Sequence, residues 1–321
     1  MNSELMKYVG STDQLLSVKR VMFTEGAESG MNAVLCDNGV FSFVFNVDRG
    51  MDLYSVKYKG VNLGATCKAG NPAPSLCFTQ ARKFHKSFNV GFLTTCGLDN
   101  IGETAEGAPA HGSLQVSPAE LVSIERCWQG DTLKVKISGE IVSASLFGER
   151  LRLVRTFETA YMSDSFTIAD TLVNEGYGAE NFYMLYHYNF GYPFLNETAY
   201  IEFPKGITTL PRREKDKAEV PAMCKMEKPA DGHFESVFFH KPKTQPVDVS
   251  VFSPKTGIKV KMSYESPALT DLIEWKSMRS GDYALGIEPA TSALDGFAKP
   301  AVIKPQQQIT NKFRFTATDI K

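Results

Sequence analysis

Hydrophobic and polar residues alternate with a period of two along most of the chain. Phe41, Phe43 and Phe45 fall on one side of their segment, and Leu133 and Ile137 belong to a run in which apolar residues alternate with lysines. A period of two is typical of half-buried antiparallel strands. The same pattern recurs in residues 164–174, 247–264 and 311–318, and residues 254–257 are predicted to form a hairpin turn. The pattern therefore predicts strands across nearly the whole length.

Helical patterns are few. Ser11 and Gln14 form a potential capping box ahead of apolar residues at 15, 16, 18 and 21, which predicts one short helix. The charge-rich interval 212–219 is predicted to be an exposed loop. No internal repeat or linker divides the chain, so we expect one all-β domain over residues 1–321. More than about fifteen strands cannot form one open sheet, and without a blade repeat a large antiparallel β-sandwich is favoured over a propeller.

The charge balance restricts the partners. Thirty-five Lys and Arg residues against 36 Asp and Glu give a net charge of −1, which argues against nucleic-acid or membrane-surface binding. No apolar run reaches the length of a spanning helix, and residues 1–10 lack the pattern of a signal peptide, so we expect a cytoplasmic protein. The six cysteines are scattered without a C-x-x-C pair. We therefore expect a small-molecule partner.

Two histidines stand in unusual local sequence. His111 follows the glycine-rich residues 91–107, which are predicted to be a long irregular loop of the kind that often carries binding residues. The alternative is a loop histidine bonded to nearby backbone. His187 lies in a segment that is apolar on both faces and is predicted to be a central buried strand. A buried histidine with only a structural role is the alternative there.

Glu288 is the most informative carboxylate. In a strand it shares one face with Ala284 and Gly286, whose small side chains leave space over the carboxylate. Pro289 favours extended geometry at Glu288, so we expect the strand to end there and to present the side chain at its rim. A buried carboxylate must be paired, hydrogen-bonded or functional, and a structural ion pair is the alternative. No hydrolase elbow, P-loop, dinucleotide fingerprint or metal-ligand spacing is present, so neither a cofactor nor a metal is expected.

Several phrases in the order typical of one family give the chain a resemblance to the aldose 1-epimerases, or galactose mutarotase-like proteins. It is most similar to a divergent bacterial branch whose members mostly lack an assigned substrate. The resemblance implies a β-supersandwich. The phrases lie at residues 48–64, 91–103, 109–112, 151–176, 184–195 and 284–296.

The resemblance also implies roles for individual residues. Glu288 matches the family's general base, His187 with Phe190 its general-acid histidine, and His111 in its H-G dipeptide a substrate-binding histidine. Substrate binding is further expected from Asn100.

The remaining family positions are matched less directly. Arg82 and Arg49 are the candidates for an expected arginine, and Arg49 is the one that we assign to substrate binding. An expected aspartate has no match, since Asp271 lies in unrelated sequence. Trp275 is either a ring that stacks on the sugar or a core residue.

The function predicted on these grounds is that of a sugar mutarotase, an isomerase that opens and recloses the ring of a monosaccharide with Glu288 as base and His187 as acid. Two alternatives remain. A sugar isomerase or C–H epimerase on the same scaffold would exchange a carbon-bound proton, and a non-catalytic carbohydrate-binding protein would bind sugar without rate enhancement. The expected partner is a small sugar, without nucleic acid, membrane or cofactor, and the sequence does not distinguish a monomer from a homodimer.

Overall fold

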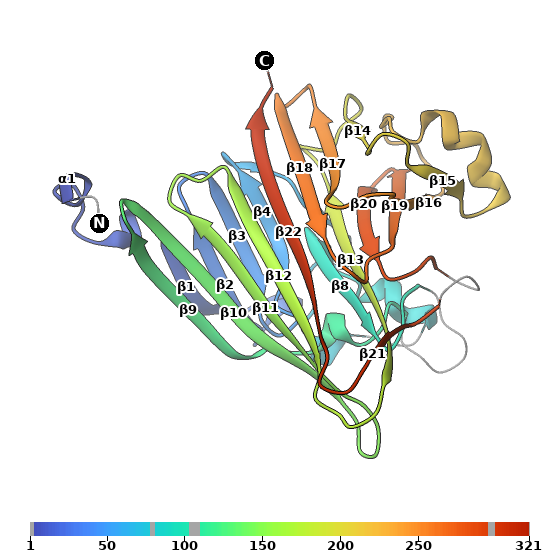
Figure 1. Ribbon diagram of the computed structural model, residues 1–321. Helices are drawn as coiled ribbons and strands as arrows, with labels where there is room; N and C mark the ends of the chain where they lie inside the picture. The colour runs from blue at the N-terminus through green and yellow to red at the C-terminus, as the bar shows by residue number, and fades with distance from the viewer. Residues whose placement is uncertain (1–2, 78–80, 103–109, 295–298, 321) are drawn as a thin grey trace.

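The computed structural model describes residues 3–77, 81–102, 110–294 and 299–320. Within them the chain forms three large antiparallel sheets and one small one (Figure 1). The five-stranded sheet has the order β1 (Ser17–Met22), β2 (Asn32–Asp37), β3 (Phe41–Asn46), β4 (Asp52–Tyr58) and β5 (Val61–Asn62). The eight-stranded sheet has the order β14 (Tyr200–Glu202), β17 (Val247–Ser253), β18 (Ile258–Glu265), β22 (Gln308–Asp319), β12 (Ser165–Asn174), β11 (Arg150–Ala160), β10 (Thr132–Ala144) and β9 (Glu120–Gln129).

The third sheet carries the candidate catalytic residues. Its order is β15 (Thr208–Pro211), β16 (Ser236–Lys241), β19 (Asp271–Arg279), β20 (Asp282–Ala290), β13 (Glu180–Phe190) and β21 (Ala301–Ile303), and β8 (Leu93–Leu98) also pairs with β13. A small sheet joins β6 (Ala65–Thr66) to β7 (Val90–Gly91). The helices are short: α1 (Ser3–Met6) and the 3₁₀ helices η1 (Thr12–Gln14), η2 (Gly26–Glu28), η3 (Pro74–Leu76), η4 (Ala81–Lys86), η5 (Leu114–Val116) and η6 (Glu214–Ala222).

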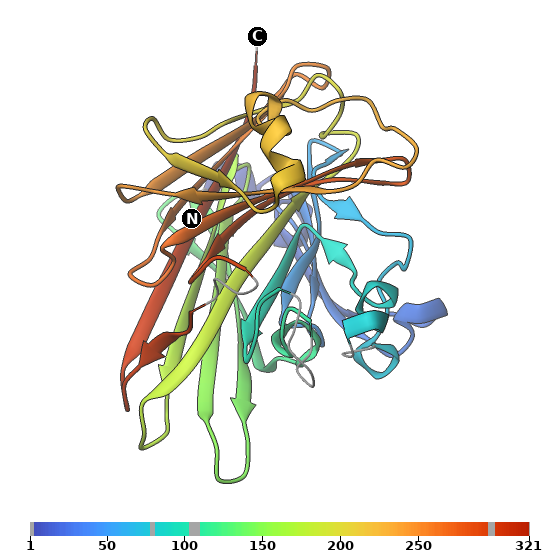
Figure 2. The same ribbon diagram turned by 90° about the vertical axis from the view of Figure 1, so that its right-hand side faces the viewer.

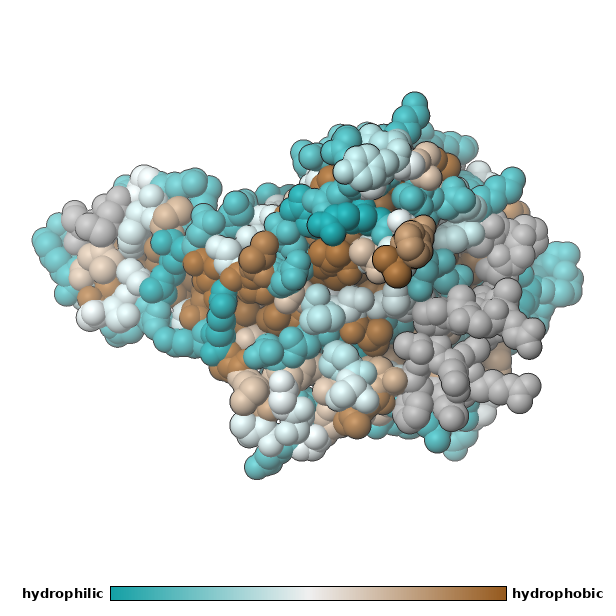
Figure 3. All heavy atoms as spheres, turned by 90° about the horizontal axis from the view of Figure 1, so that it is seen from below, coloured by the Kyte–Doolittle hydropathy of each residue, from teal (hydrophilic) through white to brown (hydrophobic). Residues whose placement is uncertain are grey.

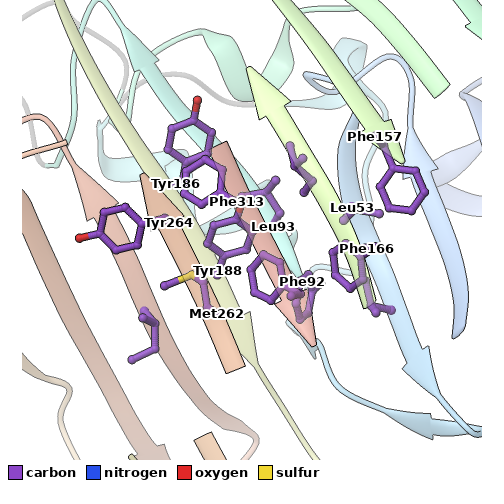
Figure 4. Packing of buried hydrophobic residues seen from close by; sticks show 14 of the residues in the cluster. Leu53, Phe92, Leu93, Phe157, Phe166, Tyr186, Tyr188, Met262, Tyr264 and Phe313 are labelled. Atoms are coloured by element: carbon purple, nitrogen blue, oxygen red, sulfur yellow. The ribbon is translucent and has the colours of Figure 1, made fainter. Parts of the chain in front are cut away.

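The eight-stranded sheet packs against both other large sheets. The ring of Phe43 in β3 packs on that of Phe157 in β11, with centroids 4.9 Å apart. This contact joins the five-stranded sheet to the eight-stranded sheet. The ring of Tyr186 in β13 packs on that of Phe313 in β22, with centroids 4.5 Å apart (Figure 4). This contact joins the third sheet to the eight-stranded sheet. Seen from below, hydrophobic residues form a band along the middle of the molecule between hydrophilic ones (Figure 3). The predicted all-β sandwich with alternating burial is thus confirmed.

Buried ion pairs connect the layers. Arg155 of β11 bonds Asp170 of β12 through both Nε and Nη2, at 2.9 and 2.6 Å, and its Nη1 lies 2.5 Å from Asp52 Oδ1 of β4. Thr95 of β8 donates to Asp52 through its backbone N–H and its hydroxyl, at 2.7 and 2.6 Å. Because a buried charge is tolerated only when it is paired, this cluster fixes β8 against the other sheets.

Three local predictions need correction. The capping box at Ser11 forms, but the helix ends at Gln14, because the next apolar residues enter β1, which pairs with β2. Much of the segment expected as an irregular loop is β7 and the buried strand β8, which pairs with β13; residues 103–107 lie outside the described residues. The interval 212–219 contributes to η6, which lies over β15 and β16 (Figure 2).

Other predictions are confirmed. Residues 254–257 form the turn between β17 and β18, with the Gly257 N–H donating to the Pro254 carbonyl. His187 lies in the buried strand β13. Glu288 lies in β20, although this strand continues to Ala290 rather than ending at Glu288. In the described part of the chain no helix is long and apolar enough to cross a membrane.

Candidate functional site

A cavity of about 360 Å³ opens against one face of the third sheet. Strands β13, β16, β19 and β20 form one side, and the segments around β6 and η4 form the other. It brings together side chains that are far apart in the sequence. Its lining comprises residues 65–69, 84, 85, 88, 90, 111, 187, 212, 235, 237, 273, 275, 282–284, 288 and 294.

His187 and Glu288 lie together in the cavity. Strand β13 pairs with β20, and this places His187 Nε2 3.2 Å from Glu288 Oε1. Their exposed fractions are 5% and 1%. Apart from their mutual 3.2 Å contact and the Asn189 side chain that acts on His187, neither His187 Nδ1 nor Glu288 Oε1 has a hydrogen-bond partner among the described residues. Since buried polar atoms are normally satisfied, these atoms are available to a bound molecule.

Gly286 makes room for this pair. It shares the cavity-facing row of β20 with Glu288, as the period-two pattern predicts. A Cβ atom at position 286 would lie 2.4 Å from Glu288 Oε1 and 3.2 Å from His187 Cε1. It would also lie 3.2 Å from the Cβ of Trp275. Only glycine therefore leaves the carboxylate where it is.

Burial sets the ionisation of the pair. It lowers the pKa of His187 to about 3, with a smaller contribution in the same direction from His111. It also raises the pKa of Glu288 well above its usual value; Glu235 adds to this effect and Arg212 opposes it. Both shifts favour the uncharged form of each group, a neutral imidazole and a protonated carboxyl group.

His111 faces the pair from another segment. Its ring centroid lies 5.8 Å from that of His187, and Phe88 stacks on it at 5.8 Å. The Gly102 N–H donates to His111 Nδ1 at 3.3 Å, so a neutral His111 carries its proton on Nε2. Gly112 explains the H-G dipeptide, since a Cβ there would lie 2.3 Å from the Gly97 carbonyl oxygen. The cavity thus brings together the three predicted residues His111, His187 and Glu288.

Trp275 also lines the cavity, at the edge of His187 with centroids 5.5 Å apart. Its indole N–H donates to Glu235 Oε2 at 2.8 Å, and Arg213 Nη1 lies 3.3 Å from Glu235 Oε1. Trp275 is therefore a cavity residue rather than a core residue, held at a fixed angle by Glu235.

Sequence reasoning missed the charged residues of the lining. Arg212 follows β15 and Glu235 precedes β16, and the pairing of these two strands brings both into the cavity. At the rim, Lys68 Nζ lies 2.8 Å from Asp282 Oδ2. None of them stands in a motif; the only available signal was the high charge of residues 212–219. Within the described residues, no three His, Cys, Asp or Glu side chains are grouped as metal ligands.

Arg49 and Asn100 do not line the cavity. Arg49 is 1% exposed, and its guanidinium donates to the carbonyl oxygens of Gln115, Pro72 and Ser87. Arg49 therefore has a structural role in place of the predicted substrate contact, because its N–H groups donate to backbone carbonyl oxygens. Asn100 Nδ2 donates to the Gly102 carbonyl at 3.2 Å and so supports the turn that holds His111.

The other arginine and aspartate considered for the family positions do not fill them either. The side chain of Arg82 lies outside the described residues. Asp271 pairs with Lys241 at 2.5 Å, away from the cavity lining.

The comparisons with known proteins agree with the fold. The model of the family described as "Domain of unknown function (DUF4432)" matches residues 28–301. No curated protein matches the sequence.

Solved structures share the galactose mutarotase-like fold at low identity. A Klebsiella pneumoniae protein named "putative aldose 1-epimerase" is 21% identical with a TM-score of 0.87, over 96% of this chain and 86% of that one. A galactose mutarotase-like protein from Clostridium acetobutylicum is 14% identical with a TM-score of 0.64, over 96% and 100%. A galactose 1-epimerase from Lactobacillus acidophilus is 11% identical with a TM-score of 0.59, over 95% and 100%.

Proposed function

Because the chain belongs to the DUF4432 family and has the galactose mutarotase-like fold, we propose that it is a mutarotase that interconverts the anomers of a monosaccharide. The observation that carries the proposal is the buried pair of His187 and Glu288, with unpartnered polar atoms in a cavity of monosaccharide size. Two structures with this fold have names that refer to 1-epimerase activity.

Mutarotation requires a proton to leave the hydroxyl on C1 while another reaches the ring oxygen. In the proposed mechanism Glu288 removes the first and His187 donates the second, so that the C1–O5 bond breaks and an open-chain aldehyde forms. Rotation about C1–C2 and the reverse transfers close the ring to the other anomer. Each positioned acid or base contributes roughly 10² to 10⁴ in rate.

Within the His187 and Glu288 pair itself, the two ends of this step differ in which residue carries the proton. The cyclic sugar faces ionised Glu288 with protonated His187, and the open chain faces the carboxylic acid with neutral histidine. Burial favours the second form, because it separates no charge. Arg212, which opposes the rise in the pKa of Glu288, favours the first. Because ring closure reverses both proton transfers, the pair returns to its starting state after each turnover.

The other lining residues suit recognition of hydroxyl groups. His111 presents an N–H through Nε2, and Arg212 and Glu235 bring a guanidinium and a carboxylate into the lining. Trp275 offers an aromatic face against which the C–H face of a sugar packs.

The test is to dissolve one pure anomer, add the protein and follow optical rotation or the anomeric proton signals. We expect equilibration faster than in buffer, and a loss of at least 10²-fold in kcat for Glu288→Gln and for His187→Asn. Activity that survives in both variants would refute these roles. Solvent deuterium appearing on a sugar carbon would instead indicate C–H chemistry and overturn the mutarotase proposal.

A further inference from the structure

One wall of the cavity consists of small alkyl groups. Ala65, Val90 and Ala284 form a separate buried cluster, are 5 to 7% exposed, and all line the cavity. We call these three residues the alkyl wall. Phe88 and Trp275 pack against it.

The alkyl wall adjoins the pair of His187 and Glu288, since Ala284 lies in the same cavity-facing row of β20 as Gly286 and Glu288. The rings of Phe88 and Trp275, which pack against the wall, each have their centroid 5.5 Å from that of His187. A substituent next to the atoms that the pair protonates and deprotonates can therefore reach this wall.

The polar side chains that line the cavity beside the wall are already engaged within the protein. Asn189, which donates to the Val90 carbonyl and whose Oδ1 has no partner among the described residues, does not line the cavity. The Cys67 thiol contacts the Phe88 carbonyl oxygen at 2.8 Å, and the hydroxyl of Thr66 is hydrogen-bonded to that of Tyr54. The indole N–H of Trp275 donates to Glu235.

The backbone of the wall is engaged as well. The carbonyl oxygen of Val90 accepts from both Thr94 Oγ1 and Asn189 Nδ2. Ala284 pairs with Ser277 in the ladder between β20 and β19. Among the described residues, the wall thus presents carbon rather than hydrogen-bonding groups to the cavity.

The chemistry of the proposed reaction orients the sugar relative to this wall. If His187 donates to the ring oxygen, C5 is the atom bonded to that oxygen on the side away from C1, and we place its substituent against the wall. In an ordinary aldohexose that substituent is CH₂OH, whose buried hydroxyl would lack a partner. In a 6-deoxyhexose it is a methyl group, which packs on alkyl side chains.

We propose that the substrate is a 6-deoxyhexose, with its C6 methyl group against Ala65, Val90 and Ala284. The inference rests on the proposed mutarotase function. A hydrophobic pocket rejects an added hydroxyl only moderately, so the expected preference is about 10- to 100-fold in kcat/KM.

The experiment uses matched sugars that differ only at C6: D-fucose against D-galactose, and L-rhamnose against L-mannose. Anomer exchange is measured for each by NMR. We expect the deoxy member of at least one pair to be the better substrate by about 10- to 100-fold. Equal or faster turnover of both parent hexoses would overturn the 6-deoxyhexose proposal and leave the mutarotase function standing. If no sugar in the panel equilibrates faster than in buffer, the function itself fails and the inference fails with it.

A variant separates the wall from other causes of preference. Ala284→Ser puts a hydroxyl on the wall, and we expect it to reduce the preference to a few-fold by improving turnover of the parent hexose. Ala119→Ser is the matched control, since Ala119 packs on the main core and does not line the cavity. A preference that is the same in Ala284→Ser and in the unsubstituted protein would show that the wall does not set it.

Discussion

Replacing Gly286 by alanine would put a methyl group into the space that the catalytic pair occupies. The added Cβ would lie 2.4 Å from Glu288 Oε1, whereas ordinary van der Waals contact begins at 3.4 Å, so the carboxylate must move by about 3.4 − 2.4 = 1.0 Å. A misplacement of about 1 Å can reduce the rate about 10²-fold. We therefore expect Gly286→Ala to lower kcat by about two orders of magnitude.

The assay is anomer exchange at saturating sugar, with thermal unfolding measured on the same samples. Gly286 lies within β20 and has no positive φ, so the strand backbone accepts alanine. Gly178→Ala is the control, because the nearest atom to its added Cβ is 3.8 Å away. Combined with Glu288→Gln, the Gly286→Ala change should add no further loss. A Gly286→Ala protein with a kcat within a few-fold of the unsubstituted one would refute the argument that this carboxylate position limits catalysis.

Three further predictions follow from the ionisation, the buried ion pairs and the cavity lining. The lowered pKa of His187 means that the pair gains a second proton only near pH 3, and the raised pKa of Glu288 means that it keeps its own proton above the usual carboxyl range. The pH profile of kcat/KM should therefore show an acid limb near pH 3 rather than near 6.5, where an unperturbed histidine titrates, and activity should fall on the alkaline side where Glu288 loses its proton; an acid limb near 6.5 would contradict this. Arg155→Met should lower the free energy of unfolding by about 3 to 5 kcal/mol in urea titrations, because it leaves two buried carboxylates unpaired; a loss below about 1 kcal/mol would refute it. Arg212→Gln should raise KM about 10- to 100-fold, as expected for a hydrogen bond from a charged group, and should also lower kcat because ionised Glu288 loses a favourable charge; an unchanged KM would exclude Arg212 from sugar binding.

The sequence alone determined the class of fold and part of the site. Alternation along a strand is a local property of the backbone, so residues 41–45 and the row that ends at Glu288 could be assigned to faces without a structure. His111 was selected because it follows a glycine-rich segment and stands in an H-G dipeptide, and the close approach of the Gly97 carbonyl now explains the glycine at position 112.

What only the tertiary structure decided is which segments meet and how deeply they are buried. Arg212 and Glu235 line the cavity because β15 pairs with β16. The local sequence of either strand does not indicate which other strand it pairs with. Arg49 stands in a phrase shared with the family, yet its environment makes it structural. The protonation of His187 and Glu288 likewise depends on desolvation, which arises only when β8, β13 and β20 enclose them. The local sequence shows which residue types are present for the proposed chemistry, whereas their contacts and their pKa values arise from the packing of the sheets.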